Sequence, residues 1–218
     1  MPRSPRLEYP GALYHVTSRG IQQGAIFVDD RDRASLLAIF TRSLHACEAR
    51  SFAFCLMGNH YHFVVQTHQA NLSRLMHRVN SIYSLTFNRR HSRLGPAFEG
   101  RFKAVHVDRD SYLLEVCRYV DLNPVRAGLV DSPGQWAWSS YRAHIGHTTS
   151  PAWLATTELH GALTGQVPAD AVQTASARRR YAEWVAAGRG VRLWKESLRH
   201  GLYLGDETFV EHVKRRGQ

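Results

Sequence analysis

Residues 51–67 read SFAFCLMGNHYHFVVQT and predict two strands joined by a tight turn. Both flanks are rich in aromatic, β-branched and other apolar residues, a composition that strands favour. Between them stands the pair Gly58-Asn59, and both residue types are common in tight turns. Because so short a connection joins only antiparallel neighbours, we expect these residues to form a β-hairpin.

Two further strands and two helices flank this hairpin in the sequence. Residues 13–19 alternate between two faces as a strand does, and residues 101–107 read as another strand. A stretch with apolar residues at helical spacing separates each of them from the hairpin. Asp29 or Asp30 is placed to cap the first helix, and Asn71 to cap the second.

The order of these elements indicates a fold class. Asp108 or Asp110 begins a third helix, so the order is strand, helix, strand, strand, helix, strand, helix. This is the split βαβ pattern, in which helices cover an antiparallel sheet. We predict an α+β fold of the ferredoxin-like type with one added helix, over residues 1–131. Residues 132–218 are predicted to form an aromatic connector and a basic, mostly helical C-terminal extension.

Composition narrows the class of partner. The 218 residues hold 28 Lys and Arg against 18 Asp and Glu, a formal net charge of +10, which favours a polyanion such as nucleic acid. No apolar run is long enough to span a membrane, and no secretory signal opens the sequence. The three cysteines, Cys47, Cys55 and Cys117, form no CxxC pair, so we expect reduced thiols and a cytoplasmic protein.

Two histidines of the second hairpin strand are candidate metal ligands. His60 and His62 are two residues apart, so both side chains leave the same face of the strand. Neutral imidazoles bind many divalent metals. The alternative is a pair of partly exposed or hydrogen-bonded histidines, and for an HxH motif taken alone the spacing favours this alternative. Zinc is not favoured, because no cysteine stands at ligand spacing and no HExxH motif is present.

A second motif, RYVDLNPVRAGLV, occupies residues 118–130. Tyr119 and Asn123 are four residues apart and would share one face of a helix. Pro124 disfavours helical geometry at Asn123, so we expect the helix to end or kink there. The alternatives are a half-buried tyrosine with a satisfied hydroxyl group and an asparagine that caps the helix C-terminus.

Together these motifs resemble the single-tyrosine HUH transposases, and more closely their REP-associated tyrosine transposase branch. The resemblance rests on His60-Tyr61-His62, on Y-x-x-x-N-P-V-R-A-G at residues 119–128, and on PGALYHVTSRG, FEGRFKA and LGDETF at residues 10–20, 98–104 and 204–209. It covers residues 10–130 closely and the remainder loosely. One departure is Gly58, where the family often has proline, and we expect it to change the rigidity of the turn rather than the chemistry.

The resemblance implies a transposase that cleaves and rejoins DNA. Tyr119 would attack a phosphodiester of single-stranded or hairpin DNA and form a covalent 5′-phosphotyrosine, which a 3′-hydroxyl group later resolves. His60, His62 and the amide oxygen of Asn123 would hold a divalent metal, Mg²⁺ or Mn²⁺. Whether the protein works as a monomer or a homodimer, and which group takes the tyrosine proton, stay open.

Four basic residues near this implied site are candidates to hold the DNA backbone: Arg19, Arg101, Lys103 and Arg126. For each, the alternative is a solvated surface charge. Two alternatives also stand for the function as a whole, a DNA-binding protein without chemistry and a metal-dependent hydrolase that uses water as the nucleophile. The intact histidine, tyrosine and asparagine set favours the transposase, because a pure binder does not need it.

Overall fold

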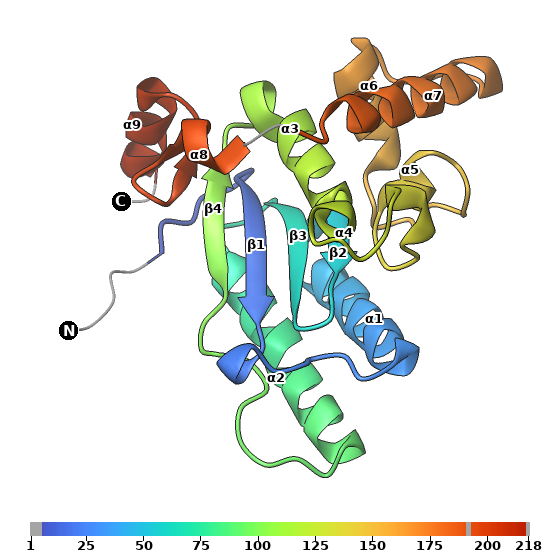
Figure 1. The fold of residues 1–218 in the computed structure, drawn as a ribbon. Coiled ribbons are helices and arrows are strands. Elements are labelled where there is room, and N and C mark those ends of the chain that lie inside the picture. Colours follow the sequence, from blue (N-terminus) through green and yellow to red (C-terminus); the bar gives the residue numbers. More distant parts are fainter. Residues whose placement is uncertain (1–5, 191–192, 217–218) are drawn as a thin grey trace.

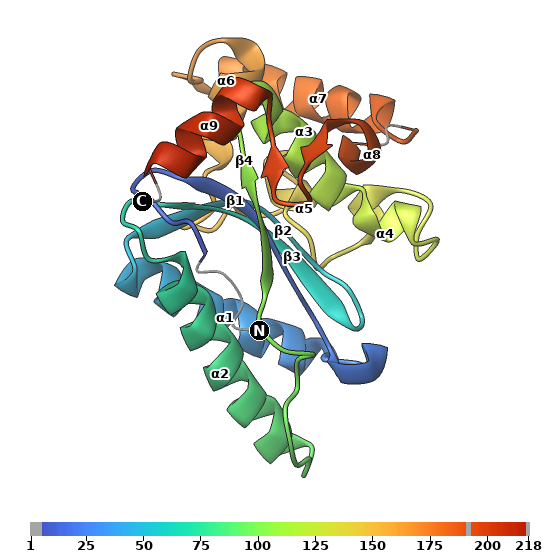
Figure 2. The ribbon, with the colours of Figure 1, turned by 90° about the vertical axis from the view of Figure 1, so that its left-hand side faces the viewer.

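The computed structural model describes residues 6–190 and 193–216 of the chain. Six strands form one sheet in the order β2-β3-β1-β4-β6-β5, and helices cover both of its faces (Figures 1 and 2). The strands are β1 (Leu13–Arg19), β2 (Ala49–Leu56), β3 (His60–Thr67), β4 (Lys103–Val107), β5 (Leu198–Arg199) and β6 (Tyr203–Leu204).

The helices fall into two groups along the chain. Among the first elements are η1 (Ile21–Gln23), α1 (Asp30–Ala46), α2 (Leu72–Arg90), α3 (Arg109–Asp121) and α4 (Asn123–Arg126). The C-terminal part holds η2 (Pro133–Gln135), α5 (Tyr141–His144), α6 (Thr156–Thr164), α7 (Ala171–Ala187), α8 (Leu193–Ser197) and α9 (Glu207–Arg216).

The predicted ferredoxin-like arrangement is confirmed. The first four strands lie in the order β2-β3-β1-β4, and each pairs with its neighbour in antiparallel fashion. The hairpin of β2 and β3 closes at Gly58 and Asn59 as expected. The helices α1 and α2 lie together on one face of the sheet, and α3 crosses the other face (Figure 2).

The predicted helix starts are largely confirmed. Asp29 caps α1 by accepting hydrogen bonds from the backbone N–H groups of Arg31 and Asp32. Asp108 caps α3 in the same way. Asn71 occupies the cap position of α2, but its side chain does not cap the helix: its Nδ2 donates to the carbonyl of Cys47, and its Oδ1, the atom that would accept from the helix, has no hydrogen-bond partner among the described residues.

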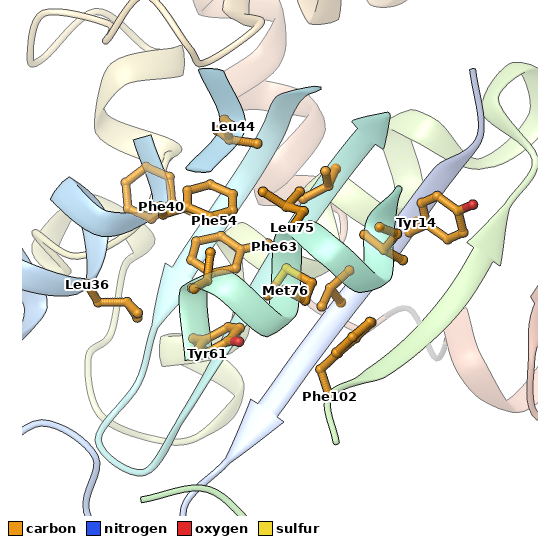
Figure 3. Close-up of a cluster of buried hydrophobic side chains, with 14 of the residues drawn as sticks. Tyr14, Leu36, Phe40, Leu44, Phe54, Tyr61, Phe63, Leu75, Met76 and Phe102 are labelled. Atoms are coloured by element: carbon orange, nitrogen blue, oxygen red, sulfur yellow. The ribbon is translucent and has the colours of Figure 1, made fainter. Parts of the chain in front are cut away.

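The sheet face under α1 and α2 holds an aromatic core. Tyr61 and Phe63 of β3 point into it, on the face opposite to that of His60 and His62, and the ring of Phe63 stacks on Phe40 of α1 with centroids 3.8 Å apart. Figure 3 shows these rings beside Leu75 and Met76 of α2. This burial of large apolar side chains holds the two helices against the sheet and leaves the opposite face to carry the histidines.

The second core lies between α3 and the other sheet face. Val116 and Val120 of α3 pack there with Val64 of β3 and with residues of α6 and α7. Cys55 and Cys117 belong to this core and Cys47 to the first. All three thiols are free, as expected for reduced cysteines, and all three are buried, where they pack as small hydrophobic residues.

Two features differ from the sequence prediction. The fourth strand begins at Lys103 rather than at residue 101, because the chain bends at Gly100, whose φ of +118° suits glycine. The short strands β5 and β6 were not predicted, since each has only two residues. The strand β6 runs parallel to β4, so the extended sheet is mixed. The domain boundary at residue 131 stays a prediction.

Candidate active site

The pairing of β1 with β3 and β4 gathers polar residues on the sheet face that α3 crosses. Arg19 lies opposite His60, and Thr17 lies opposite both His62 and Lys103. Residues opposite each other in an antiparallel pair point to the same face. The histidines of β3 therefore share one surface with Arg19 and Lys103, as their positions in the sequence suggested.

The two histidines of the HxH motif lie in one cluster of hydrogen-bonded rings. Their ring centroids are 5.0 Å apart. His60 pairs its Nδ1 with Oδ1 of Asn59 at 2.7 Å, and His62 pairs its Nδ1 with Nε2 of His15 on β1 at 2.9 Å. Both ligand candidates are thus oriented through Nδ1, which leaves Nε2 as the free ring nitrogen of each.

Burial keeps these imidazoles neutral. It lowers the pKa of His15 to about 3 and, helped by the positive charge of Arg19, the pKa of His60 to about 4. Burial and the neighbouring histidines hold the pKa of His62 well below its ordinary value. A neutral imidazole has a nitrogen lone pair, which is the form that binds a metal.

The helix α3 places Tyr119 beside this cluster. The centroid of its ring lies 6.0 Å from that of His62 and 5.9 Å from that of His15, with both pairs edge to face. Trp194 of α8 lies 5.1 Å away. The guanidinium of Arg126 sits over the tyrosine ring, 4.8 Å from its centroid. Tyr119 is only partly buried, so the residue is in part accessible from outside the core.

Asn123 lies at the kink that Pro124 was predicted to cause. The helix α3 ends at Asp121, Leu122 takes the C-cap position, and Asn123 begins the short helix α4. Its Nδ2 donates to the carbonyl oxygens of Tyr119 and Val120, at 3.0 and 3.4 Å. This uses the amide nitrogen and not the amide oxygen, which is the atom that would bind a metal.

The two histidines can supply part of the coordination shell of a metal, but not all of it. Nε2 of His62 is buried without a hydrogen-bond partner, an arrangement that a bound ligand would relieve. Within residues 6–190 and 193–216, no three His, Cys, Asp or Glu side chains are placed to hold a metal together. A metal on His60 and His62 would therefore need oxygen ligands from an amide, from water or from a substrate phosphate.

A family model described as "Transposase IS200 like" matches residues 9–123, more than half of the chain. The chain belongs to the IS200-like transposase family. No curated protein matches it. None of its helices, where the structure describes them, is long and apolar enough to cross a membrane.

Two solved structures resemble this IS200-like transposase. One is described as a REP-associated tyrosine transposase bound to a REP hairpin; it is 14% identical, with a TM-score of 0.57 over 71% of this chain and 92% of that chain. The other is described as a candidate transposase from Deinococcus radiodurans R1; it is 12% identical, with a TM-score of 0.40 over 55% of this chain and 96% of that chain. The first likeness supports the same fold.

The four basic residues proposed for DNA contact are all exposed, but they are not equally close to Tyr119. Arg126 lies over its ring, and Arg19 and Lys103 lie on the histidine face of the sheet. Arg101 lies outside β4, in the bend that precedes the strand. Two residues of the transposase beside Tyr119, His15 and Trp194, were not predicted as site residues from the sequence. Their rings stack on each other with centroids 4.8 Å apart.

The end of α3 is anchored by a buried carboxylate. Asp121 is fully buried and accepts hydrogen bonds from Oγ of Ser140, at 2.6 Å, and from the hydroxyl group of Tyr181 on α7, at 2.8 Å. Burial raises its pKa to about 7. These bonds tie the C-terminal extension to a residue two positions after Tyr119, so the extension helps to fix the helix that carries the tyrosine.

We expect Tyr181→Phe to lower the free energy of unfolding by about 1–3 kcal/mol, because it leaves one oxygen of Asp121 unpaired in the core. The loss should be larger at pH 8 than at pH 6, since the carboxyl group is ionised only above its raised pKa. Urea unfolding at both pH values measures this. Tyr83→Phe is the control, because the hydroxyl group of Tyr83 donates to the carbonyl of Ile26, which does not titrate. Equal losses at both pH values for Tyr181→Phe would contradict the expectation.

Proposed function

We propose that this protein cleaves and rejoins single-stranded, hairpin-bearing DNA through a covalent tyrosine intermediate, as a member of the REP-associated branch of its family. The observation that carries the proposal is the position of Tyr119, whose ring lies beside His62 and under the guanidinium of Arg126. The sequence motifs, and the described binding of a REP hairpin by the structurally similar transposase, support this choice of branch and substrate.

In the proposed reaction, the hydroxyl oxygen of Tyr119 attacks a backbone phosphorus atom. The bond from phosphorus to the 3′-oxygen breaks, and that oxygen leaves with a proton as a free 3′-hydroxyl group. The downstream strand stays bound to Tyr119 through its 5′-phosphate. A 3′-hydroxyl group of another strand end then attacks this phosphotyrosine and releases the tyrosine, so no nucleotide cofactor is needed to restore the phosphodiester.

The side chains around the tyrosine have two further roles: basic residues bind the DNA backbone, and neutral residues bind the metal. Arg126 is placed to hold a phosphate next to the ring, and Arg19 and Lys103 to position the backbone on the sheet face. His60 and His62, with the amide of Asn123, are the residues proposed to hold Mg²⁺ or Mn²⁺. A metal bound there would neutralise the charge that develops on the scissile phosphate.

Trapping the intermediate tests this function. Full-length protein is incubated with 3′-end-labelled hairpin DNA and Mn²⁺, and the products are separated on a denaturing gel. We expect a labelled protein–DNA adduct, with mass spectrometry of its peptides placing the nucleotide on Tyr119. Cleavage without an adduct would favour hydrolysis by water. Binding without either product would favour a DNA-binding protein that has lost its chemistry.

We expect DNA affinity to fall steeply with salt, because contacts to phosphates release counterions. Arg19→Ala should reduce the slope of log affinity against log salt concentration by about 1, the share of one phosphate contact. Arg42→Ala is a matched control, since Arg42 is exposed on α1, in the helical layer on the opposite face of the sheet. Fluorescence anisotropy across a salt series gives both slopes. A flat salt dependence for the wild type would contradict binding through the backbone.

A further inference from the structure

A third histidine, outside the HxH motif, contacts the proposed ligand His62. Nε2 of His15 on β1 lies 2.9 Å from Nδ1 of His62 on β3, and the two rings stack with centroids 5.1 Å apart. The contact is diagonal across the strand pair, because Val64 lies opposite His15 and Thr17 lies opposite His62. Both side chains are nearly fully buried, at 6% exposure each.

The proton shared by these two nitrogens is bonded either to Nδ1 of His62 or to Nε2 of His15. A neutral imidazole has one N–H and one lone pair, so a single hydrogen atom serves the pair. If Nδ1 of His62 carries it, Nε2 of His62 is a lone pair; if Nε2 of His15 carries it, Nε2 of His62 is an N–H. Only the first arrangement lets His62 bind a metal, since its Nδ1 is already used.

The position of His15 is fixed from two sides. The indole of Trp194 stacks on its ring with centroids 4.8 Å apart, and the ring of Tyr119 meets it edge to face at 5.9 Å. These two contacts favour the ring orientation that presents Nε2 of His15 to His62. Nε2 of His62 meanwhile has no hydrogen-bond partner among the described residues. The ring of His15 is thus packed in place, while the nitrogen on the far side of His62 stays available.

We propose that His15 is a positioning residue, which accepts a hydrogen bond from Nδ1–H of His62 and so holds Nε2 of His62 as a lone pair ready for a divalent cation. This inference rests on the proposed role of His62 as a metal ligand. It gives a second role to the PGALYHVTSRG segment, which also carries Arg19: its histidine orients a ligand on the neighbouring strand.

The first test measures Mn²⁺ binding without DNA. Electron paramagnetic resonance of free Mn²⁺ during titration gives the affinity of wild-type protein and of His15→Phe, which keeps a ring against Trp194 but has no acceptor. We expect a loss of about 10–100-fold in affinity, the usual effect of removing the partner of a ligand. His15→Gln, whose amide oxygen can still accept, should recover part of the loss.

His106→Phe is the matched control. His106 is another buried strand histidine, at 5% exposure, but it belongs to β4 and packs among the rings of Tyr9, Tyr14 and Tyr203 in the opposite face of the sheet. This variant should bind Mn²⁺ like the wild type. Equal affinities for His15→Phe and the wild type would overturn the proposal.

A second test needs no metal and separates this inference from the proposed function. Nitrogen-15 NMR of the metal-free, full-length protein reports which imidazole nitrogen carries the proton. We expect His62 to be the Nδ1–H tautomer in the wild type and a mixture of tautomers in His15→Phe. An Nε2–H tautomer in the wild type would overturn the role of His15. Wild-type protein with the expected tautomer but no Mn²⁺ binding would instead contradict the metal-dependent part of the proposed function.

Discussion

Tyr119→Phe is expected to lower the rate of DNA cleavage by about 10⁴-fold or more, the scale seen when a covalent nucleophile is removed. The substitution takes away one oxygen atom, the atom proposed to attack phosphorus. The remaining ring still fills the space beside His62 and Trp194, so DNA affinity should stay nearly unchanged. Single-turnover cleavage of labelled hairpin DNA gives the rate, and anisotropy gives the affinity.

Tyr112→Phe is the control for this result. Tyr112 lies on the same helix, two turns before Tyr119, and is also only partly buried. It should cleave at the wild-type rate, because nothing places it beside the histidine pair. If Tyr119→Phe cleaved within about tenfold of the wild type, with no adduct in either protein, water would be the nucleophile and Tyr119 a structural residue.

Much of the fold follows from local signals in the sequence. The hairpin was predictable because the turn pair Gly58-Asn59 separates two apolar strands, and this fixes which residues of β3 face the helices. Asp29 and Asp108 mark helix starts through hydrogen bonds within a few residues. Such signals depend on near neighbours in the chain, so they can be read without knowing the tertiary structure.

The cluster around His62 could be predicted only in part. His60 and His62 share a face through the two-residue period of a strand, which the sequence shows directly. His15 joins them only through the register of β1 against β3, and Trp194 through the return of the chain after α7. Both contacts are set by packing between distant segments, and neither residue stands out by spacing.

Asn123 shows why a motif does not specify a geometry. The spacing from Tyr119 and the following proline predicted a kink, and the structure has one. The direction of the amide depends on which hydrogen bonds its two ends make, and here its nitrogen donates to two carbonyl groups in the last turn of α3. Its role as a metal ligand therefore stays a proposal, and the Mn²⁺ titration extended to Asn123→Ala tests it.

Lowering the pH from 7 to 5 is expected to reduce the free energy of unfolding by several kcal/mol. Burial lowers the pKa of His106 to about 4 and that of His144 to about 3, against about 6.5 in the unfolded chain. The contribution of each histidine to stability is fully present above pH 6.5. It is lost as the pH falls toward the folded-state pKa, because the unfolded chain then binds a proton that the buried imidazole does not bind. Over this interval the cost is about 2 kcal/mol for each.

Asp121 acts in the opposite direction. Its raised pKa of about 7 means that the folded chain takes up this proton before the unfolded chain does, so the contribution of Asp121 to stability falls as the pH rises through 7. Between pH 7 and 5 it adds about 2 kcal/mol, which offsets one histidine. Because His15, with a pKa of about 3, adds to the effect of His106 and His144, the net change is still a loss.

Urea unfolding at pH 7 and pH 5 measures this loss, and His106→Phe assigns a share of it. Phenylalanine fits among the rings that surround His106 and cannot titrate, so the difference between the two pH values should shrink by about 2 kcal/mol. His68→Gln is the control, because His68 is exposed and its replacement should leave the difference unchanged. Stability that is independent of pH in this range would mean that the buried imidazoles take up protons without unfolding, and the neutral, ligand-ready state proposed for the active-site histidines would lose its physical basis.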